Sequence, residues 1–210
     1  EENLSAETVP QETLNRWAAQ WETSELRSRL SSFLKGEAGR QLQHIDQIIC
    51  FGLGCPLKVS LWPEAACRPY QQHLAACTIR DLIANTPGCT APTIFAQDPE
   101  YSSAEKAYLS DQLKINVLDD PEGFKSLTGN TFVITISPNV PVRQIVVDMT
   151  HEDGGPAGFL CHDISSDGLE CDGVGLREED GRNVTPYSTC PLSPALLEYK
   201  QKSISMEYDD

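Results

Sequence analysis

A glycine turn follows one of the most apolar stretches of the sequence. Residues 48–55 read IICFGLGC, so Gly52 and Gly54 come directly after an apolar run. In nucleotide-binding α/β proteins such a turn lets the backbone approach a phosphate at the end of the first buried strand. The full dinucleotide pattern GxGxxG also needs a glycine where this sequence has Leu57. The turn therefore predicts a ligand-facing loop, but it argues against a dinucleotide site of the usual NAD type.

Cysteine and histidine supply the candidates for nucleophilic chemistry. A cysteine nucleophile needs a lowered pKa and a nearby base. Cys55 directly follows the glycine turn, and His73 is the histidine on a neighbouring predicted helix, so these two are the catalytic candidates. Cys55 and Cys190 each precede a proline, a dipeptide associated with haem-responsive thiolates, so they are the haem candidates. The alternative interpretation, an ordinary structural cysteine, is favoured for Cys55.

Polar residues follow the other predicted strands. Asp98 comes after the second strand, Asp119 after the third, and Ser137 and Asn139 after the fourth. The carboxyl ends of parallel strands share one edge of a sheet, where doubly wound folds bind ligands. Together with the glycine turn, these side chains predict a small-molecule site. Asp-Pro and Asp-Asp-Pro are also common turn formers, and the sequence leaves both interpretations of the aspartates open.

No metal site is predicted. The densest group of possible ligands is Cys161, His162, Asp163, Asp167, Glu170, Cys171 and Asp172. A calcium loop that starts at Asp163 would have Val174 where the bidentate glutamate belongs. Paired CxxC spacing, typical of zinc sites, does not occur. A solvated acidic loop is the better explanation of the cluster.

Charge restricts the partners. The formal net charge is −15, and no basic stripe with interleaved aromatic residues occurs, so direct binding to nucleic acid is not expected. The acidic balance also argues against anionic membranes, and no apolar run reaches the roughly 18 residues of a membrane span. We expect protein partners or a small molecule. No targeting signal is expected in residues 1–10, and the eight cysteines are expected to be reduced and intracellular.

Short apolar runs alternate with helical patterns along most of the chain. Strands are expected at 48–51, 91–97, 114–120, 131–138 and 157–164, and helices at 11–34 with a cap at Ser24, 68–88, 102–113, 141–149 and 194–203. Either Ser102 or Ser103 is expected to cap the helix at 102–113. One face of the helix at 68–88 is expected to consist of Tyr70, Leu74, Cys77, Thr78 and Leu82, and the apolar face of the helix at 141–149 is expected to consist of Val142, Ile145, Val146 and Met149. This alternation predicts a mostly parallel sheet covered on both faces, an α/β Rossmann-like three-layer sandwich. We expect a helical segment at 1–44 that packs on the core, the Rossmann-like domain at 45–164, and an irregular acidic loop and tail at 165–210.

The chain resembles the sensitivity-to-red-light-reduced family over about residues 45–150. The resemblance is carried in order by IICFGLGC, QQHLAACTIRDLI, DPEYSSAEKAYL, KINVLDDPEGF and TFVITISPNVPVRQIVVDM. Its fungal form is the most similar, including the tail TPYSTCPLSPALLEYKQKS. Plant and animal members more often have a histidine in the turn after the fourth strand. This chain has Ser137-Pro138-Asn139 there, so no role of that histidine is carried over.

The resemblance implies a regulatory protein. Members are linked to light signalling and circadian timing in plants, and to haem biosynthesis and cytoskeletal phenotypes elsewhere, without an established reaction. We therefore expect a regulator that acts in the cytoplasm and nucleus through protein contacts. Two alternatives stay open: a small-molecule enzyme, such as a transferase, at the carboxyl edge of the sheet, and a haem or metal sensor that uses the Cys-Pro sites.

Overall fold

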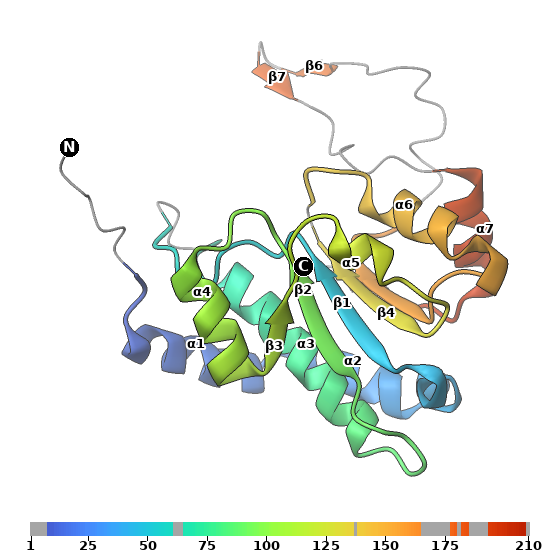
Figure 1. Cartoon of the computed structure of the whole chain (residues 1–210), viewed down its shortest axis with the longest axis horizontal. Helices are drawn as coiled ribbons and strands as arrows, with labels where there is room; N and C mark the ends of the chain where they lie inside the picture. Colours follow the sequence, from blue (N-terminus) through green and yellow to red (C-terminus); the bar gives the residue numbers. More distant parts are fainter. Residues whose placement is uncertain are drawn as a thin grey trace.

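A parallel sheet forms the centre of the molecule (Figure 1). The computed structural model describes residues 8–60, 65–136, 138–164, 177–179, 182–184 and 193–208. The strands are β1 (Gln47–Phe51), β2 (Thr93–Gln97), β3 (Ile115–Val117), β4 (Thr131–Thr135) and β5 (Gly158–Cys161), and they pair in the order β3-β2-β1-β4-β5. All of these pairings are parallel. The predicted α/β class and parallel sheet are confirmed.

Alternate residues of β1 and β4 face two separate cores. Ile48 and Ile134 belong to the core under α2 (Glu25–Lys35) and α3 (Arg68–Ala84). Ile49 and Val133 belong to the core under α6 (Val142–Met149) on the other face. These strands are apolar at every position of both faces because helices cover both sides. The result is the expected three-layer arrangement.

Further helices complete the two outer layers. The first face also carries α1 (Gln11–Glu22), and beyond α3 it continues to α4 (Ser103–Tyr108) and a π-helical turn (Leu109–Leu113). The other face carries α5 (Glu122–Lys125) and α7 (Pro194–Lys202). Short 3-10 turns lie at Glu37–Arg40, Leu42–His44 and His151–Asp153. None of the helices in the described residues has the length and apolar content needed to span a membrane.

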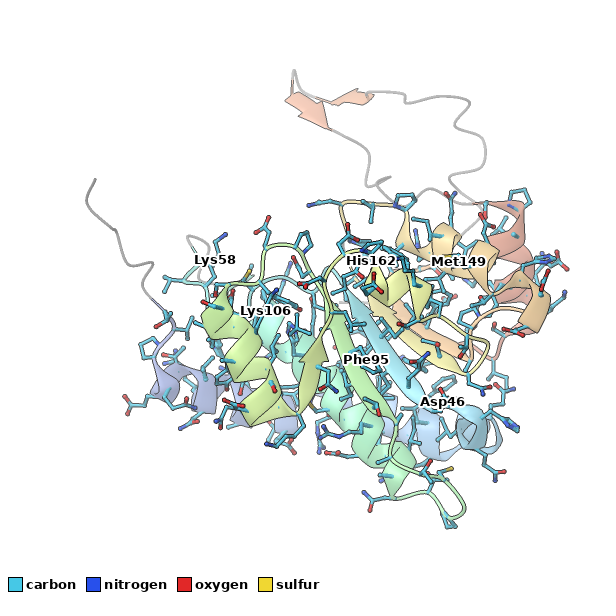
Figure 2. The ribbon with its side chains drawn as sticks, viewed as in Figure 1. Asp46, Lys58, Phe95, Lys106, Met149 and His162 are labelled. Carbon is cyan, nitrogen blue, oxygen red and sulfur yellow. The ribbon has the colours of Figure 1, made fainter. Side chains whose placement is uncertain are left out.

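The strand order reverses between β1 and β4. From β1 the chain passes through α3 to β2 and then β3 on one side, whereas β4 and β5 extend the sheet on the other. In open α/β sheets this is where ligands bind, at the carboxyl ends of the strands. Lys58 lies at that end of the molecule and Asp46, which precedes β1, lies at the opposite end (Figure 2).

The predicted core face of α3 is wrong in part. Of the predicted face, Tyr70 is buried, but four members are only half-buried: Leu74, Cys77, Thr78 and Leu82. The most deeply buried residues of the helix are His73, Ala75, Ala76, Ile79 and Ile83. Because α3 lies between the sheet and the pair α1–α2, it is covered on two sides, and its small alanines permit close approach to a neighbouring layer.

One other expectation also needs correction. Met149 was expected on the apolar face of α6, but it is 52% exposed, because the buried positions of this helix end at Val147. After residue 165 the described residues include a short antiparallel pair, β6 (Arg177–Glu179) and β7 (Arg182–Val184). The helix expected near 194–203 is confirmed as α7, which buries Leu196 against Val147.

Candidate functional site at the carboxyl edge of the sheet

Asp98 joins two loops at the carboxyl edge. The amide of Gly54 donates to its Oδ2 at 2.9 Å, and the amide of Glu100 donates to its Oδ1 at 3.0 Å. The carboxylate therefore ties the loop after β1 to the loop after β2. A carboxylate that accepts backbone amides with both oxygens has a structural role that needs no ligand.

The two glycines of the turn are required by the backbone. Gly52 and Gly54 have φ of 62° and 74°, in the left-handed region that residues with a Cβ rarely adopt. A Cβ on Gly52 would lie 3.5 Å from Pro138, and one on Gly54 would lie 3.4 Å from Pro69. The turn therefore places the loop after β1 directly beside the loop after β4, at the point where the strand order reverses.

The remaining predicted ligand residues do not converge. Asp119 is exposed, and its Oδ1 accepts from Lys106 Nζ at 2.9 Å, which joins the end of β3 to α4. Asn139 is exposed in the loop between β4 and α6. Ser137 lies outside the described residues. Of the predicted set, only Gly54 and Asp98 are in direct hydrogen-bonded contact within the described part of the chain.

Cys55 is buried and protonated. Cys55 is 9% exposed, and its Sγ donates to the carbonyl of Glu100 at 3.3 Å. Burial, with the nearby Glu105 carboxylate, raises the pKa of this thiol to about 12. A thiol of this kind is a poor nucleophile and a poor haem or metal ligand, since each of those roles needs the thiolate. Cys190, the other haem candidate, lies outside the described residues.

His73 is enclosed in the protein and already has two partners. Its Nδ1 lies 2.6 Å from the carbonyl of Pro69, so Nδ1 carries the hydrogen. Its Nε2 therefore accepts from the hydroxyl of Tyr101 at 2.7 Å. Burial lowers the pKa of His73 to about 4, so the ring is neutral at pH 7. Among the hydrogen bonds of the described residues, none joins His73 to Cys55.

Sequence reasoning missed three residues at this edge. Nothing in the sequence indicates that Tyr101, in the loop after β2, is the hydrogen-bond partner of a histidine in α3. Glu105 is buried and accepts from both the amide and the hydroxyl of Ser102 at 2.9 Å, as part of a capping box. The S-x-x-E spacing of Ser102 and Glu105 is the sequence pattern of a capping box, but it was interpreted only as the start of a helix. Gln97 accepts from the amide of Gly123 at 2.7 Å and donates to Asp120 at 2.8 Å, which only the fold brings together.

The described residues include no group of three potential ligands arranged to hold a metal ion. Within the acidic stretch singled out in the sequence, Asp163 Oδ1 accepts from Lys200 Nζ at 2.7 Å. The members of that stretch from Asp167 to Asp172 lie outside the described residues. The six cysteines of the described part are free thiols.

The comparison with protein families decides the relationship. The model of the SRR1 domain matches residues 14–205, which spans the chain from α1 to the end of α7. The chain belongs to the SRR1 domain family. The corresponding comparisons with curated proteins and with solved structures gave no match. The SRR1 match is much longer than the resemblance over residues 45–150. The assignment to the fungal form stays a prediction.

In this SRR1 domain four of the polar side chains at the carboxyl edge are engaged with other parts of the protein. Asp98, Cys55, His73 and Glu105 each bond to a neighbouring loop or cap. Such bonds hold the loops after β1 and β2 in one arrangement. Chemically, the arrangement provides rigidity, and it keeps both the thiol of Cys55 and the ring of His73 neutral at pH 7.

Proposed function

We propose that this SRR1 domain protein is a regulator that acts through contacts with other proteins, in the cytoplasm and nucleus. The family resemblance suggests light, circadian or haem-linked signalling as its context. The single observation that carries the proposal is the state of Cys55 and His73. Both are buried, both are bonded to the protein itself, and both have pKa values that oppose catalysis at pH 7.

The argument rests on what a catalytic pair requires. A cysteine nucleophile must lose its proton to a base within hydrogen-bond reach. Here the thiol of Cys55 donates to a backbone carbonyl, and His73 uses both ring nitrogens on Pro69 and Tyr101. These interactions favour the neutral forms of both groups. The same interactions fix the loops of the carboxyl edge, so that this edge presents a constant surface to a partner.

Replacing the candidate nucleophile tests the proposal. Cys55→Ala should retain the regulatory output in cells that lack the wild-type protein, with the half-buried Cys89→Ala as the matched control. Thermal unfolding of both variants separates lost stability from lost chemistry. Turnover of a nucleotide or aminoacyl substrate by the purified protein, abolished in Cys55→Ala but not in Cys89→Ala, would contradict the proposal.

A second candidate function is small-molecule chemistry at the reversal point between β1 and β4, such as group transfer. The observation that favours it is Thr135 at the end of β4. This residue is 1% exposed, and its hydroxyl has no hydrogen-bond partner among the described residues. Buried hydroxyls are usually paired. Native mass spectrometry of protein purified from its own host tests this candidate, because a retained small molecule that Thr135→Val releases would support it.

The haem-sensor alternative has less support. A haem thiolate at Cys55 would need a deprotonated and accessible sulfur, and this thiol is buried with a pKa of about 12. Titration with haem, followed by the Soret band, compares wild type with Cys55→Ala and Cys190→Ala. A spectral change that depends on either cysteine would revive this alternative.

A further inference from the structure

A groove of about 670 Å³ lies on the first face of the molecule, between α2 and α3 and close to the end of α1. It is separate from the carboxyl-edge residues discussed above, none of which lines it. Its volume falls in the range of small-molecule sites. One wall is formed by α2, with Arg27, Ser28, Ser31, Ser32 and Lys35, and its floor is formed by α3.

The α2 wall carries polar groups without protein partners. The hydroxyls of Ser28, Ser31 and Ser32 make no hydrogen bond within the described residues, and Lys35 makes no ion pair there. Ser31 and Ser32 precede Lys35 by four and three residues, so all three lie together on the helix surface. A cluster of two hydroxyls and an ammonium group is suited to a phosphate or carboxylate.

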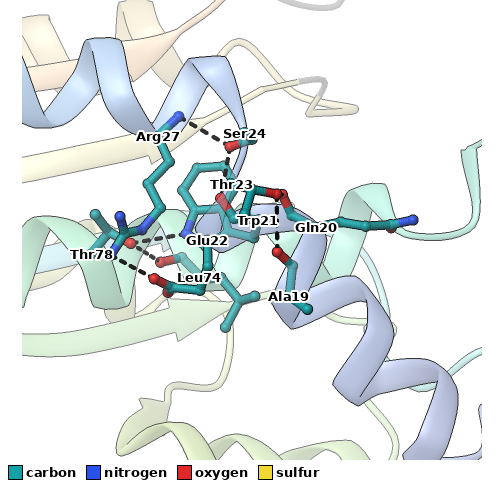
Figure 3. Close-up of polar contacts among 9 residues, drawn as sticks. All are labelled: Ala19, Gln20, Trp21, Glu22, Thr23, Ser24, Arg27, Leu74 and Thr78. Atoms are coloured by element: carbon teal, nitrogen blue, oxygen red, sulfur yellow. Dashed lines mark hydrogen bonds and ion pairs between the residues drawn. The ribbon is translucent and has the colours of Figure 1, made fainter.

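Arg27 adds a second cationic group at the other end of the groove. Figure 3 shows its side chain extending from α2 toward α3, with its guanidinium beside Glu22 and Thr78. Its Nη2 pairs with Glu22 Oε2 at 2.8 Å, but its Nε is buried and has no hydrogen-bond partner in the described part of the chain. The arrangement is held in place by Trp21, whose indole donates to Thr78 Oγ1 at 3.0 Å.

The acidic groups that line the groove are already neutralised. Glu22 pairs with Arg27, and Asp81 Oδ1 accepts from Arg80 Nε at 2.9 Å. Lys35 is therefore the cation without a counter-ion in the described part of the groove. A local positive charge in a chain of net charge −15 favours an anionic ligand over a cationic one.

Part of the floor of the groove is apolar, although Thr78 and Asp81 also line it. Leu74, Cys77 and Leu82 line it from α3, and all of them are half-buried. Burial raises the pKa of Cys77 to about 11, so this thiol is neutral and behaves as an apolar group. Leu74, Cys77 and Leu82 all belong to the face of α3 that the sequence pattern predicts. Their partial exposure leaves an apolar strip beside the charged end.

We propose that this groove binds a small organic anion that carries a phosphate or carboxylate on an apolar body. The anionic group lies against Lys35, Ser31 and Ser32, and the apolar body covers Cys77 and Leu82. The site goes beyond the proposed function, since it uses none of the carboxyl-edge residues. A free phosphate ester and a lipid headgroup share this chemistry, so the experiment includes a probe for each source.

Calorimetric titration with hexyl phosphate tests the site on the full chain. We expect saturable binding at millimolar concentration or below, and binding about tenfold weaker in Lys35→Gln, because a charge-assisted hydrogen bond is lost. Ser28→Trp should block binding by filling the groove without removing a charge. Lys114→Gln is the matched control, because Lys114 is an exposed lysine outside the groove. It should bind hexyl phosphate as wild type does.

Co-sedimentation with phosphatidylcholine vesicles that contain phosphatidic acid tests the lipid source. Binding to either probe that both Lys35→Gln and Ser28→Trp weaken supports the groove and identifies the source. Absence of binding to both probes overturns the proposal. So does binding that Lys114→Gln weakens equally, because that result would reflect general attraction to lysines. Circular dichroism of each variant confirms that it is folded.

Discussion

At the scale of single residues, the clearest feature is the hydrogen bond between His73 and Tyr101. The imidazole is fully buried and Tyr101 is 6% exposed, so neither group can exchange its partner for water. A buried acceptor that loses its donor keeps the full cost of its desolvation. The rings also approach each other, with centroids 5.8 Å apart. This pair is a structural link between α3 and the loop after β2.

Tyr101→Phe should destabilise the fold by about 1–3 kcal/mol, because it leaves Nε2 of His73 buried without a donor. Urea unfolding at pH 7 measures the change. Tyr108→Phe is the matched control, since its hydroxyl makes only a long contact of 3.4 Å with Tyr70. Tyr108→Phe should lower the free energy of unfolding by less than Tyr101→Phe does. Equal losses of unfolding free energy in the two variants would show that the hydrogen bond to His73 contributes no more to stability than the Tyr108 contact.

His73 should also make the fold sensitive to acid. Burial lowers the pKa of His73 to about 4, below its ordinary value of 6.5, so between these values the unfolded chain binds more protons. Stability is therefore complete above pH 6.5 and falls as the pH drops toward 4, by up to about 3 kcal/mol. Unfolding free energies at a series of pH values measure this loss. His73→Gln should flatten the curve in that window, and the exposed His151→Gln should not.

At the scale of elements, the strands were predictable and the contacts between elements were not. Ile48 to Phe51 are buried on both faces, so their continuous apolar run is a direct sign of a central strand. Ser24 caps α2 as expected, and of the two expected candidates, Ser102 and Ser103, it is Ser102 that caps α4. The core face of α3 was mispredicted because two layers cover this helix, and periodicity alone indicates one face.

The position of the candidate site could be predicted from the sequence, but the protonation and the contacts of its residues could not. The glycine turn and Asp98 do meet at the carboxyl edge, as parallel strands require. Whether Cys55 is ionised depends on its burial and on Glu105, which is fifty positions away in the sequence. The Gln97 contact with Gly123 likewise needs the β2–α5 packing. Such groupings follow from the tertiary structure and leave no local pattern in the sequence.

The capping box at the start of α4 makes a prediction at this scale. Ser102→Ala removes the side chain that accepts from the amide of Glu105, and it also removes the hydroxyl that donates to the Glu105 carboxylate. We expect a loss of about 1 kcal/mol in the free energy of unfolding. Ser103→Ala, one position into the helix and exposed, is the control and should be nearly neutral. A larger loss in Ser103→Ala would contradict the assignment of the cap.

At the scale of the whole molecule, the end of the described chain connects distant parts of the fold. α7 packs on α6, where Leu196 is fully buried with Val147 and Ile164. The chain then returns to α2, where Arg29 Nη2 donates to the carbonyl of Glu207 at 2.9 Å. The same guanidinium lies 5.1 Å from the centre of the Tyr208 ring. The SRR1 match extends to residue 205, so it includes α7 and ends before Glu207 and Tyr208.

Two truncations should separate these contributions. Ending the chain before Pro194 removes α7 and should cost at least about 2 kcal/mol, because the apolar surface around Leu196 becomes exposed. Ending it after Lys202 removes the contacts to Arg29, the ion pair between Lys200 and Glu207 and the hydrogen bonds of Ser203 to the end of α7, and it should cost less than about 1 kcal/mol because these contacts are largely exposed. Thermal or urea unfolding measures both. Equal losses from the two truncations would show that α7 itself contributes little to stability.

The contact between Gln97 and Gly123 has a consequence for the history of the family. A Cβ at position 123 would lie 2.6 Å from Gln97 Oε1 and 3.0 Å from the ring of Phe51. A side chain at position 123 therefore requires a shorter residue at position 97 and a small shift of the Phe51 ring, and a change at position 123 alone is disfavoured. The two positions should vary together among relatives, as substitutions that evolution accepts in pairs.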